Sequence, residues 1–582
     1  MIIFKGNLKT QFYNDKKMQQ KAYLNNISKP NYAWISYLII IVILTLIIRH
    51  FNFIADDLKI LKAAQHNPFP FFSDWENTNT GMYRPIIILS YYVNFLLFKF
   101  HPFPYYLFNI LLHLISTIIL YKILVKLLKL TNKNEVTINR YSFITSLVFL
   151  ILPQNLINVY WIAGRNDLIC GFFVLLSILC FIVFIDCRKK FYFEVSLFLE
   201  IFAFMSKETA LVFGFYMVSI YIFYLLISKK KVPVLFFIPH VLIILLYVLF
   251  RYLIFGHNML GKSEFISSNF FEILKYIFYG FWALFIPLDV LDYIHLIVVD
   301  NWFMFVIISI VLFLLLFSVL YSLKKSFVAL SYPFLIIILS YFSLIIYVGN
   351  YPQMRLIYAH IPLLLLGIVL FLIELRNKLN FKRVFLLSYF FILLIGVNTI
   401  VYRIITMNNY YEKLNNILPT KEEYDMKNHF IFLPYLGRIS QSWVDPDIKL
   451  MESLNIYNNL NSSSEKITKI ISYSTYSCYA ILPSFIYTKI NDSTFIMEAD
   501  DNYIYAPRAS KKFVESAKTI NYFNSHIHVT PLDEINIRPG KSSKIKIELD
   551  KKYDWSNVEI FYPDNGDYKK ENVEQFMKGM NH

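Results

Sequence analysis

Long apolar runs are the feature that most limits how this chain can fold. A helix that crosses a membrane needs about 20 mostly apolar residues, and runs near that length recur between residues 32 and 404. We therefore expect an α-helical polytopic membrane protein with about 11–13 transmembrane helices. The strongest candidate spans are Tyr32–Ile48, Pro104–Leu128, Tyr141–Trp161, Leu168–Ile185, Phe191–Met205, Ala210–Ile227, Val232–Phe255, Trp302–Tyr321, Phe327–Val348, Leu356–Glu374 and Val384–Ile404.

Lysine and arginine between these runs indicate the orientation of the chain. Cytoplasmic loops of membrane proteins are enriched in both residues, so the lysine-rich N-terminal arm, residues 1–31, should be cytoplasmic. The remaining basic clusters agree only if two shorter apolar stretches, Pro85–Phe100 and Phe271–Leu288, stay on the outer side without crossing. The first outer loop is then residues 51–103, and the C-terminal tail emerges outside.

Composition narrows the classes of function. The formal net charge of +16 would suit nucleic acid, but the Lys and Arg residues lie in short clusters between apolar segments. We therefore expect a membrane protein without a nucleic-acid partner. The four cysteines follow neither a disulfide framework nor a metal-finger spacing. Frequent Ile, Lys, Asn, Phe and Tyr suit an AT-rich genome, which leads us to expect a bacterial inner membrane with an outward-facing active site.

The composition changes near residue 405, where polar residues become dominant. Alternating runs such as SSKIKIEL and NVEIFY predict β-strands, and Asp447–Asn459 is a candidate helix. We expect residues 405–582 to form an extracytoplasmic α+β domain, to which the sequence assigns no role. It would follow a transmembrane catalytic domain over residues 32–404.

Ionisable residues recur at the outer turns of this topology, where charges near hydrocarbon are costly and indicate function. The first outer loop contains two adjacent carboxylates, Asp56 and Asp57. Cations at the outer turns run against the usual excess of positive charge on the inner side. The remaining candidate site residues are Arg84, Arg165, Lys207, Glu208, Arg355 and Tyr358.

Each of these residues also has an ordinary structural explanation. Asp56 and Asp57 could be solvated loop acids or acids at a helix N-terminus. Lys207 and Glu208 could form a local ion pair at a helix end, and the arginines could reach lipid phosphates. The recurrence of acids and cations on one membrane face favours a shared functional site over these separate explanations.

Such a set suits transfer of a sugar from a lipid-linked phosphate donor. An outer acid can act as general base, taking the proton of an acceptor hydroxyl as it attacks a sugar carbon. Cations at the same depth can hold the leaving lipid phosphate. On a helix, Asp56 and Asp57 point about 100° apart, so only one would be the base. The other would position the acceptor or help to bind a divalent cation, Mg²⁺ or Mn²⁺; no other cofactor is indicated.

Several short segments share their order and spacing with a known family. They are FIADDLKIL, YRPIIILSYYVN, PFPYYLFNILLH, WIAGRNDLICGFFVLLSI, FMSKETAL, FRYLIFG, FIPLDVLDY and MRLIYAHIPLL. Across residues 33–375 this series resembles the GT-C superfamily of polytopic glycosyltransferases. It is most similar to the branch of transmembrane and tetratricopeptide-repeat O-mannosyltransferases and their bacterial relatives.

The resemblance implies a catalytic acidic motif in the first outer loop, here Asp56 and Asp57. It also implies a polyprenyl-phosphate sugar donor and an inverting transfer on the outer face. Two departures leave the donor sugar and the acceptor open: Leu152-Pro153 and Ile157 replace a usual His-Pro turn and Glu, and the repeat array is missing. The positions implied near the donor phosphate or the acceptor are Arg84, Arg165, Lys207, Glu208, Arg355 and Tyr358.

Three functions are therefore compatible with the sequence. The leading one is an inverting glycosyltransferase that moves a sugar from a polyprenyl phosphate to a lipid, glycan or protein acceptor. The second is an envelope glycan polymerase or ligase, or a phospho-group transferase, which would use outer cations but need not depend on Asp56 or Asp57. The third is a transporter, which should carry charges near the membrane midplane, where His113 and Glu200 are the candidates.

Overall fold

The structure is a computed structural model that describes part of the 582-residue chain. The described residues are 30–51, 83–131, 134–225, 232–255, 357–374, 416–427, most of 429–443, most of 467–475, 485–499, 504–505, most of 520–532, most of 544–580, and single residues that include Phe53, Asp57, Leu61, Ala64, Ile307 and Leu394.

The chain divides into two compact units, which we describe separately. The first comprises Met1–His50, Phe69–Phe285 and Val306–Phe391. The second comprises Phe51–Pro68, Ile286–Phe305 and Ile392–His582. The described part of the first unit is helical, whereas the described part of the second consists mainly of strands.

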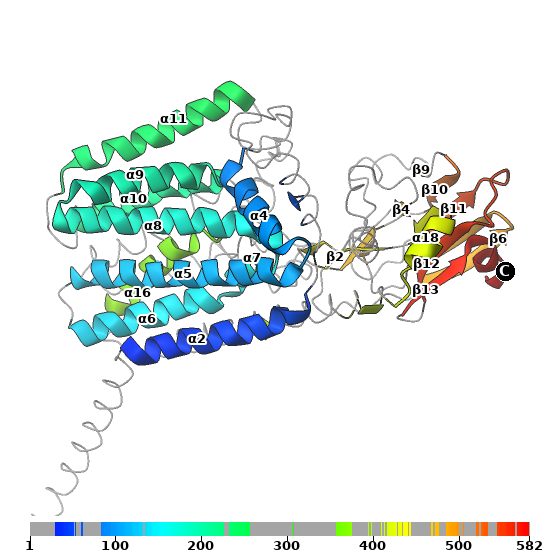
Figure 1. Cartoon of the computed structure of the whole chain (residues 1–582), viewed down its shortest axis with the longest axis horizontal. Helices are drawn as coiled ribbons and strands as arrows, with labels where there is room; N and C mark the ends of the chain where they lie inside the picture. Colours follow the sequence, from blue (N-terminus) through cyan, green and yellow to red (C-terminus); the bar gives the residue numbers. More distant parts are fainter. Residues whose placement is uncertain are drawn as a thin grey trace, which may run out of the picture. The chain divides into compact units, whose positions relative to one another are not determined.

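The helices of the first unit follow most of the apolar runs (Figure 1). Short 3₁₀ turns, labelled η, join several of them. The described helices and turns are α2 (Pro30–Ile47), η1 (Ile48–His50), α4 (Pro85–Phe98), α5 (Pro102–Lys129), α6 (Glu135–Ile151), α7 (Pro153–Val159), η3 (Ile162–Gly164), α8 (Arg165–Cys187), α9 (Lys190–Phe204), η4 (Glu208–Leu211), α10 (Val212–Phe223), η6 (Val234–Phe236), α11 (Ile238–Phe255) and α16 (Ile361–Glu374).

One predicted span, Tyr141–Trp161, is not a single helix. The axes of α6 and α7 differ by 54°. Pro153 explains the bend, because its ring excludes the helical conformation at the preceding residue and it has no N–H to donate. Leu152 accordingly has extended backbone angles, with φ −63° and ψ 127°. Every residue of α7 is buried, so this short helix lies inside the helical unit.

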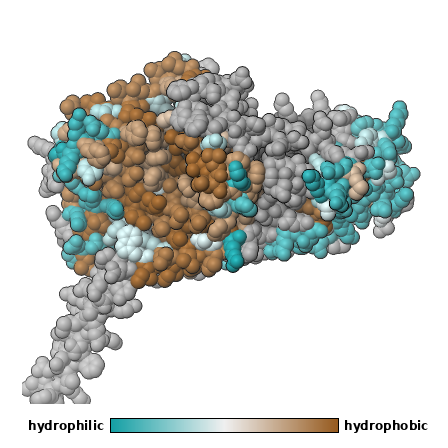
Figure 2. All heavy atoms as spheres, viewed as in Figure 1, coloured by the Kyte–Doolittle hydropathy of each residue, from teal (hydrophilic) through white to brown (hydrophobic). Residues whose placement is uncertain are grey.

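The outward faces of the helices are apolar. Large side chains on the surface include Leu38 and Leu46 of α2 and Leu245 and Leu253 of α11, each at least 60% exposed. Figure 2 shows apolar atoms over the helical unit and hydrophilic atoms over much of the second unit. Among the described residues, three helices are long and apolar enough to cross a membrane, or four if the bent α6–α7 pair is one span. These surfaces indicate association with a membrane.

Several expectations fall on residues that the structure does not describe. Apart from single positions, the predicted spans Trp302–Tyr321, Phe327–Val348 and Val384–Ile404 lie outside the described residues, as does the stretch Phe271–Leu288. The stretch Pro85–Phe100 does form a short helix, α4. Whether it crosses the membrane stays a prediction.

Small residues allow the helices at the centre of the unit to approach closely. Between α8 and α9, the Ser177 hydroxyl donates to the Ser196 carbonyl at 2.7 Å, and the Ser196 hydroxyl donates to the Ser177 carbonyl at 2.9 Å. Gly171 of α8 faces the Tyr358 ring so closely that a Cβ would lie 2.6 Å from Tyr358 Cε1. Small interface residues of this kind are typical of helices that pack within membranes.

The second unit is built from three described sheets. In one, β1 lies parallel to both β12 and β4, and in another all neighbouring strands are antiparallel. The orders are β13-β12-β1-β4, β6-β7-β11-β10-β9 and β3-β2-β5-β8. The strands are β1 (His429–Phe432), β2 (Tyr435–Ile439), β3 (Ser442–Trp443), β4 (Ile467–Lys469), β5 (Ser472–Thr475), β6 (Phe485–Asn491), β7 (Thr494–Ala499), β8 (Ile504–Tyr505), β9 (Ile520–Tyr522), β10 (Ile527–Pro531), β11 (Lys544–Leu549), β12 (Val558–Asp564) and β13 (Asp567–Asn572).

Two short helices complete this unit. α18 (Lys421–Met426) begins with a capping box, in which the Thr420 backbone N–H donates to the Glu423 carboxylate and lowers its pKa. α21 (Val573–Gly579) packs the Phe576 ring against Tyr487 and Phe495, which come from β6 and β7. The strands predicted in KIKIEL and VEIFY are confirmed as β11 and β12. The candidate helix Asp447–Asn459 lies outside the described residues.

Gly164 should be intolerant of a side chain. A Cβ there would lie 2.7 Å from Asn158 Cα and closer still to the Asn158 carbonyl oxygen, both backbone atoms of α7. We expect Gly164→Ala to lower the free energy of unfolding by about 3 kcal/mol, because the turn must move. The measurement is unfolding of the purified chain in detergent.

Gly214→Ala is the matched control, because its Cβ would meet only the flexible end of Ile244, at 3.3 Å. It should be neutral or slightly stabilising, since alanine favours the helix over glycine by about 1 kcal/mol. Equal stability of the two variants would contradict this account of the turn.

Candidate functional site

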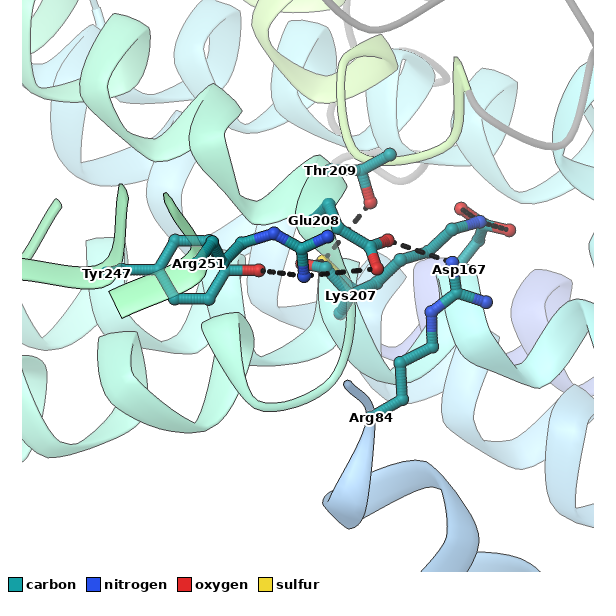
Figure 3. A network of polar contacts seen from close by, with 8 residues as sticks. Arg84, Asp167, Lys207, Glu208, Thr209, Tyr247 and Arg251 are labelled. Carbon is teal, nitrogen blue, oxygen red and sulfur yellow. Dashed lines mark hydrogen bonds and ion pairs between the residues drawn. The ribbon is translucent and has the colours of Figure 1, made fainter. Parts of the chain in front are cut away.

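Two arginines from distant segments meet at Glu208. Arg84 Nη2 donates to Glu208 Oε2 at 2.8 Å, and Arg251 Nη1 lies 3.4 Å from Glu208 Oε1 (Figure 3). Arg251 Nη1 also donates to the Tyr247 hydroxyl at 3.3 Å. Each oxygen of one carboxylate is thus held by a different arginine. We call Arg84, Glu208 and Arg251 the arginine–glutamate triad.

A second ion pair lies beside the triad. Lys207 Nζ is 2.6 Å from both carboxylate oxygens of Asp167, and both side chains are at most 5% exposed. Lys207 precedes Glu208 in the turn between α9 and η4, and Asp167 lies in the first turn of α8. Figure 3 shows the Lys207–Asp167 pair next to the arginine–glutamate triad.

Local backbone structure brings Arg84 to this place. It is the residue before Pro85, which occupies the first turn of α4, where a proline needs no N–H partner. One residue further, the Ile86 N–H donates to the Met205 carbonyl at 3.4 Å. This bond joins the start of α4 to the turn that carries Lys207 and Glu208, so the backbone sets the distance between Arg84 and Glu208.

The cluster combines three cations with two anions. An unpaired charge buried in an apolar helical unit is strongly destabilising, whereas close pairing offsets most of the cost. The fully ionised cluster has a net charge of +1: Arg84, Lys207 and Arg251 against Asp167 and Glu208. Arg84 is its most exposed member, with 19% of its side chain accessible, compared with 3% for Glu208 and 2% for Arg251. Of these five side chains, Arg84 therefore has the most access to the surface.

Arg165, predicted beside the other cations, lies in a different environment. Its side chain is fully buried, and it donates to Asn109 Oδ1 and to the Tyr105 carbonyl at 3.1 Å each and to the Ser90 carbonyl at 3.3 Å. Its guanidinium carbon is 4.5 Å from the centroid of the Tyr91 ring, a cation–π geometry. These contacts connect α8 to α4 and α5.

Tyr358, also predicted at the site, is fully buried and hydrogen-bonded to His113. The Tyr358 hydroxyl is 2.8 Å from His113 Nδ1, and His113 Nε2 is 3.1 Å from the Leu150 carbonyl. A carbonyl only accepts, so Nε2 carries the hydrogen, and in the neutral ring Nδ1 accepts from the tyrosine. The His113 ring therefore links α5, α6 and the turn before α16.

The predicted catalytic acids are only partly described. Asp57 belongs to the second unit and is fully buried, while Asp56 and Arg355 lie outside the described residues. The expected pocket shared by these acids and the outer cations stays a prediction. Where the structure describes the chain, no three His, Cys, Asp or Glu residues gather in a way that could hold a metal ion; the divalent cation considered at Asp56 and Asp57 also stays a prediction.

Arg251 was missing from the residues selected from the sequence, although the segment FRYLIFG that contains it was noted. The sequence did contain a reason to select it, because it is the one arginine within the apolar run Val232–Phe255 and a charge in such a run indicates function. Asp167, which lies in the segment WIAGRNDLICGFFVLLSI, was also not selected. Its importance depends on the contact with Lys207, which lies 40 residues further along the chain.

By fold and by site, the described residues define a mainly helical, membrane-associated protein with paired charges gathered at its helix ends. No known protein-family profile matches the chain. The sequence is 31% identical over 151 residues to human "Protein O-mannosyl-transferase TMTC1" and 31% identical over 145 residues to human "Protein O-mannosyl-transferase TMTC4". It is 36% identical over 109 residues to the mouse TMTC4 protein. The resemblance to the O-mannosyltransferase branch is thereby confirmed.

The similarity is confined to part of each sequence. The aligned segments cover 24% and 23% of this chain and 16% and 20% of the two human relatives. The mouse alignment covers 18% of this chain and 15% of that relative. The chain thus matches about a fifth or less of the length of these relatives. The same activity for this chain is therefore a proposal.

The Lys207–Asp167 pair gives a direct test of the charge cluster. We expect Asp167→Asn to lower the free energy of unfolding by about 3–5 kcal/mol, because it removes a carboxylate that pairs with a buried ammonium. The control is Asp186→Asn, whose carboxylate pairs with Lys126 at 2.9 Å but is 35% exposed. That exposed pair should be worth about 0–1 kcal/mol.

Both variants would be unfolded in detergent micelles under the same conditions. A cost for Asp167→Asn no larger than that for Asp186→Asn would mean that water reaches Lys207 and that the cluster is not a low-dielectric site.

Proposed function

We propose that this chain is a polytopic membrane glycosyltransferase of GT-C type. It transfers a sugar from a polyprenyl-phosphate donor to a lipid, glycan or protein acceptor on the outer face of the membrane, with inversion at the sugar carbon. Residues 32–404 would form the catalytic domain with about 11–13 spans, and residues 405–582 an extracytoplasmic domain. The inner membrane of a bacterium is the proposed location.

The arginine–glutamate triad is the observation that supports this proposal most strongly. Glu208 has two arginine partners, one on each carboxylate oxygen. If Arg84 turns to an incoming phosphate, Arg251 still pairs with Glu208, and no buried carboxylate is left without a cation. Arginine matches the forked geometry of phosphate oxygens, and Arg84 is the member of the triad that is accessible. The triad thus suits reversible binding of a lipid phosphate.

The proposed reaction needs a base and a place for developing negative charge. The acceptor oxygen attacks the anomeric carbon, and its proton passes to the carboxylate of Asp57 or Asp56. The bond between that carbon and the phosphate oxygen breaks, and its electron pair leaves with the lipid phosphate. Arg84, with Lys207 and Arg251 nearby, would stabilise that charge, an effect usually worth about 10²–10³ in rate for each donor.

Two other residues predicted at the site fit a supporting role better than contact with substrate. Arg165 and Tyr358 are both fully buried, and their polar atoms are engaged by neighbouring helices. They would fix the positions of α4, α8 and the turn before α16. The similar human proteins are named protein O-mannosyl-transferases, which makes mannose and a protein acceptor the first candidates to test.

Replacement of Asp57 by asparagine tests the proposed base. Membranes containing the full chain would be supplied with labelled polyprenyl-phosphate mannose, then glucose, and label transferred to any acceptor would be measured. We expect Asp57→Asn to slow transfer by about 10²–10⁴-fold, the usual contribution of a general base. Asp56→Asn would be assayed alongside, because only one of the two carboxylates serves as the base.

Asp186→Asn is the control for this assay, since it makes the same chemical change at an exposed site paired with Lys126. It should transfer sugar at the wild-type rate. Wild-type rates for both Asp57→Asn and Asp56→Asn would exclude the acid-dependent mechanism and favour the polymerase, ligase or phospho-transferase alternative. Uptake of a solute into sealed vesicles without any sugar transfer would favour the transporter.

A further inference from the structure

A second pair of ionisable groups lies outside the charge cluster. His240 Nδ1 of α11 is 2.6 Å from Glu200 Oε2 of α9, and both side chains are completely buried. The other polar atoms of the pair, Glu200 Oε1 and His240 Nε2, are also buried and have no hydrogen-bond partner in the part of the chain that the structure describes. The sequence indicated Glu200 only as one of two candidate charges for the transporter alternative.

The surroundings of the pair are aromatic. The rings that contact His240 among the described residues are Phe181 of α8 at 4.9 Å, Phe193 of α9 at 5.7 Å and Phe213 of α10 at 5.4 Å between centroids. None of these side chains titrates or carries charge.

Charged groups elsewhere on the same helices are paired with other residues. Arg251 is bound to Glu208, Asp186 to Lys126 and Glu194 to Lys190. Within the described residues, each member of the Glu200–His240 pair is therefore the only ionisable group in contact with the other.

The proton content of the pair follows from this environment. A glutamate anion beside a neutral imidazole would leave a full negative charge among phenyl rings, with no cation in contact. One added proton makes the pair neutral overall. The proton then lies on the carboxylic acid, which donates to the imidazole, because two neutral groups avoid the desolvation cost of a buried ion pair. A second added proton would leave a buried positive charge. Buried uncompensated charge is costly, so the state with one added proton is the stable one.

Besides the Phe193–His240 ring contact, three described contacts between the α9–η4 segment and α11 follow one another along the chain, and the Glu200–His240 pair is the first of them. The next is a stack of the Phe204 and Tyr247 rings, with centroids 4.4 Å apart and an interplanar angle of 29°. The last is the contact of Glu208 with Arg251. The three contacts occur in the same order along both segments, from Glu200 with His240 to Glu208 with Arg251. Much of the rest of α11 is apolar and exposed. The proton pair and the arginine–glutamate triad therefore hold the same helix.

We propose that Glu200 and His240 form a proton-binding site, in which Glu200 carries a proton at neutral pH and α11 is thereby held against α9. Loss of this proton leaves a buried anion and weakens the docking of α11, the helix that supplies Arg251 to the triad. The site is independent of the proposed sugar transfer and would exist whatever the substrate.

The expected dependence on pH follows from counting bound protons. Below about pH 4.3 the unfolded chain binds two protons at these residues, between about 4.3 and 6.5 it binds one, and above about 6.5 it binds none. The folded pair binds one throughout. Above about pH 6.5 the folded chain therefore holds one more proton than the unfolded chain, and stability falls as pH rises, by about tenfold in the folding equilibrium constant per pH unit.

Glu200→Gln separates this site from all other titrating groups. The glutamine amide can donate to His240 Nδ1 at any pH, so the variant has no proton to lose above pH 6.5. The ratio of the wild-type to the Glu200→Gln unfolding constant should rise by about a hundredfold from pH 7 to pH 9 in mixed micelles. Glu194→Gln, on the exposed face of the same helix, should follow wild type. A ratio for Glu200→Gln that stays constant over this range would overturn the proposal.

Infrared spectroscopy of the full chain at neutral pH locates the proton. Wild type and Glu194→Gln should show the carbonyl stretch of a protonated carboxylic acid, shifted in D₂O, and Glu200→Gln should lack it. A spectrum unchanged by Glu200→Gln would overturn the assignment. If Glu200→Gln does not fold, Glu200→Leu combined with His240→Phe replaces it, because removing both polar groups strands no charge. This double variant should lose the decline in stability above pH 6.5, and its retention would also overturn the proposal.

Discussion

The requirement that buried charges be paired organises the helical unit. Glu208 lies among apolar helices with 3% of its side chain exposed, and it is kept ionised by Arg84 and Arg251. These two contacts hold the start of α4 and the later part of α11 to the turn after α9. The pairing thus performs two tasks at once: it joins three segments that lie far apart in the sequence, and it places Arg84, the most exposed of these side chains, beside Glu208.

The fold was predictable to the extent that local pattern determines it. Apolar length is a property of a single segment, and the helices α2, α5, α8, α9, α10 and α11 follow the predicted runs. Alternation likewise identified β11 and β12. The error at Tyr141–Trp161 arose because hydropathy averages over Pro153, whereas the missing N–H and the restricted conformation of Leu152 act at one peptide unit.

The site was predictable as a set of charges but not as a set of contacts. Lys207 and Glu208 stood out because ionisable residues are rare beside apolar runs. Arg84 was selected for the same reason, but its contact with Glu208, 124 residues away, could not be read from local sequence. Arg251, 43 residues from Glu208, was not selected. Arg165 shows the limit most clearly. The N–H groups of an arginine can bind either a phosphate or a set of protein carbonyl oxygens, and the sequence does not distinguish the two. Only the folded structure shows that Arg165 donates to protein oxygens.

The bend at Pro153 has a consequence far from the bend itself. The early end of α6 leaves carbonyl groups without the N–H donors of a next turn. Asn155 Nδ2 donates to the Phe149 carbonyl at 2.7 Å, and His113 Nε2 takes the Leu150 carbonyl. His113 is thereby committed to one tautomer, its remaining nitrogen can only accept, and Tyr358 is oriented by it. The His113 imidazole, with both nitrogens in hydrogen bonds to the protein, therefore fixes the position of the Tyr358 hydroxyl, and its own orientation depends on a proline that lies on another helix.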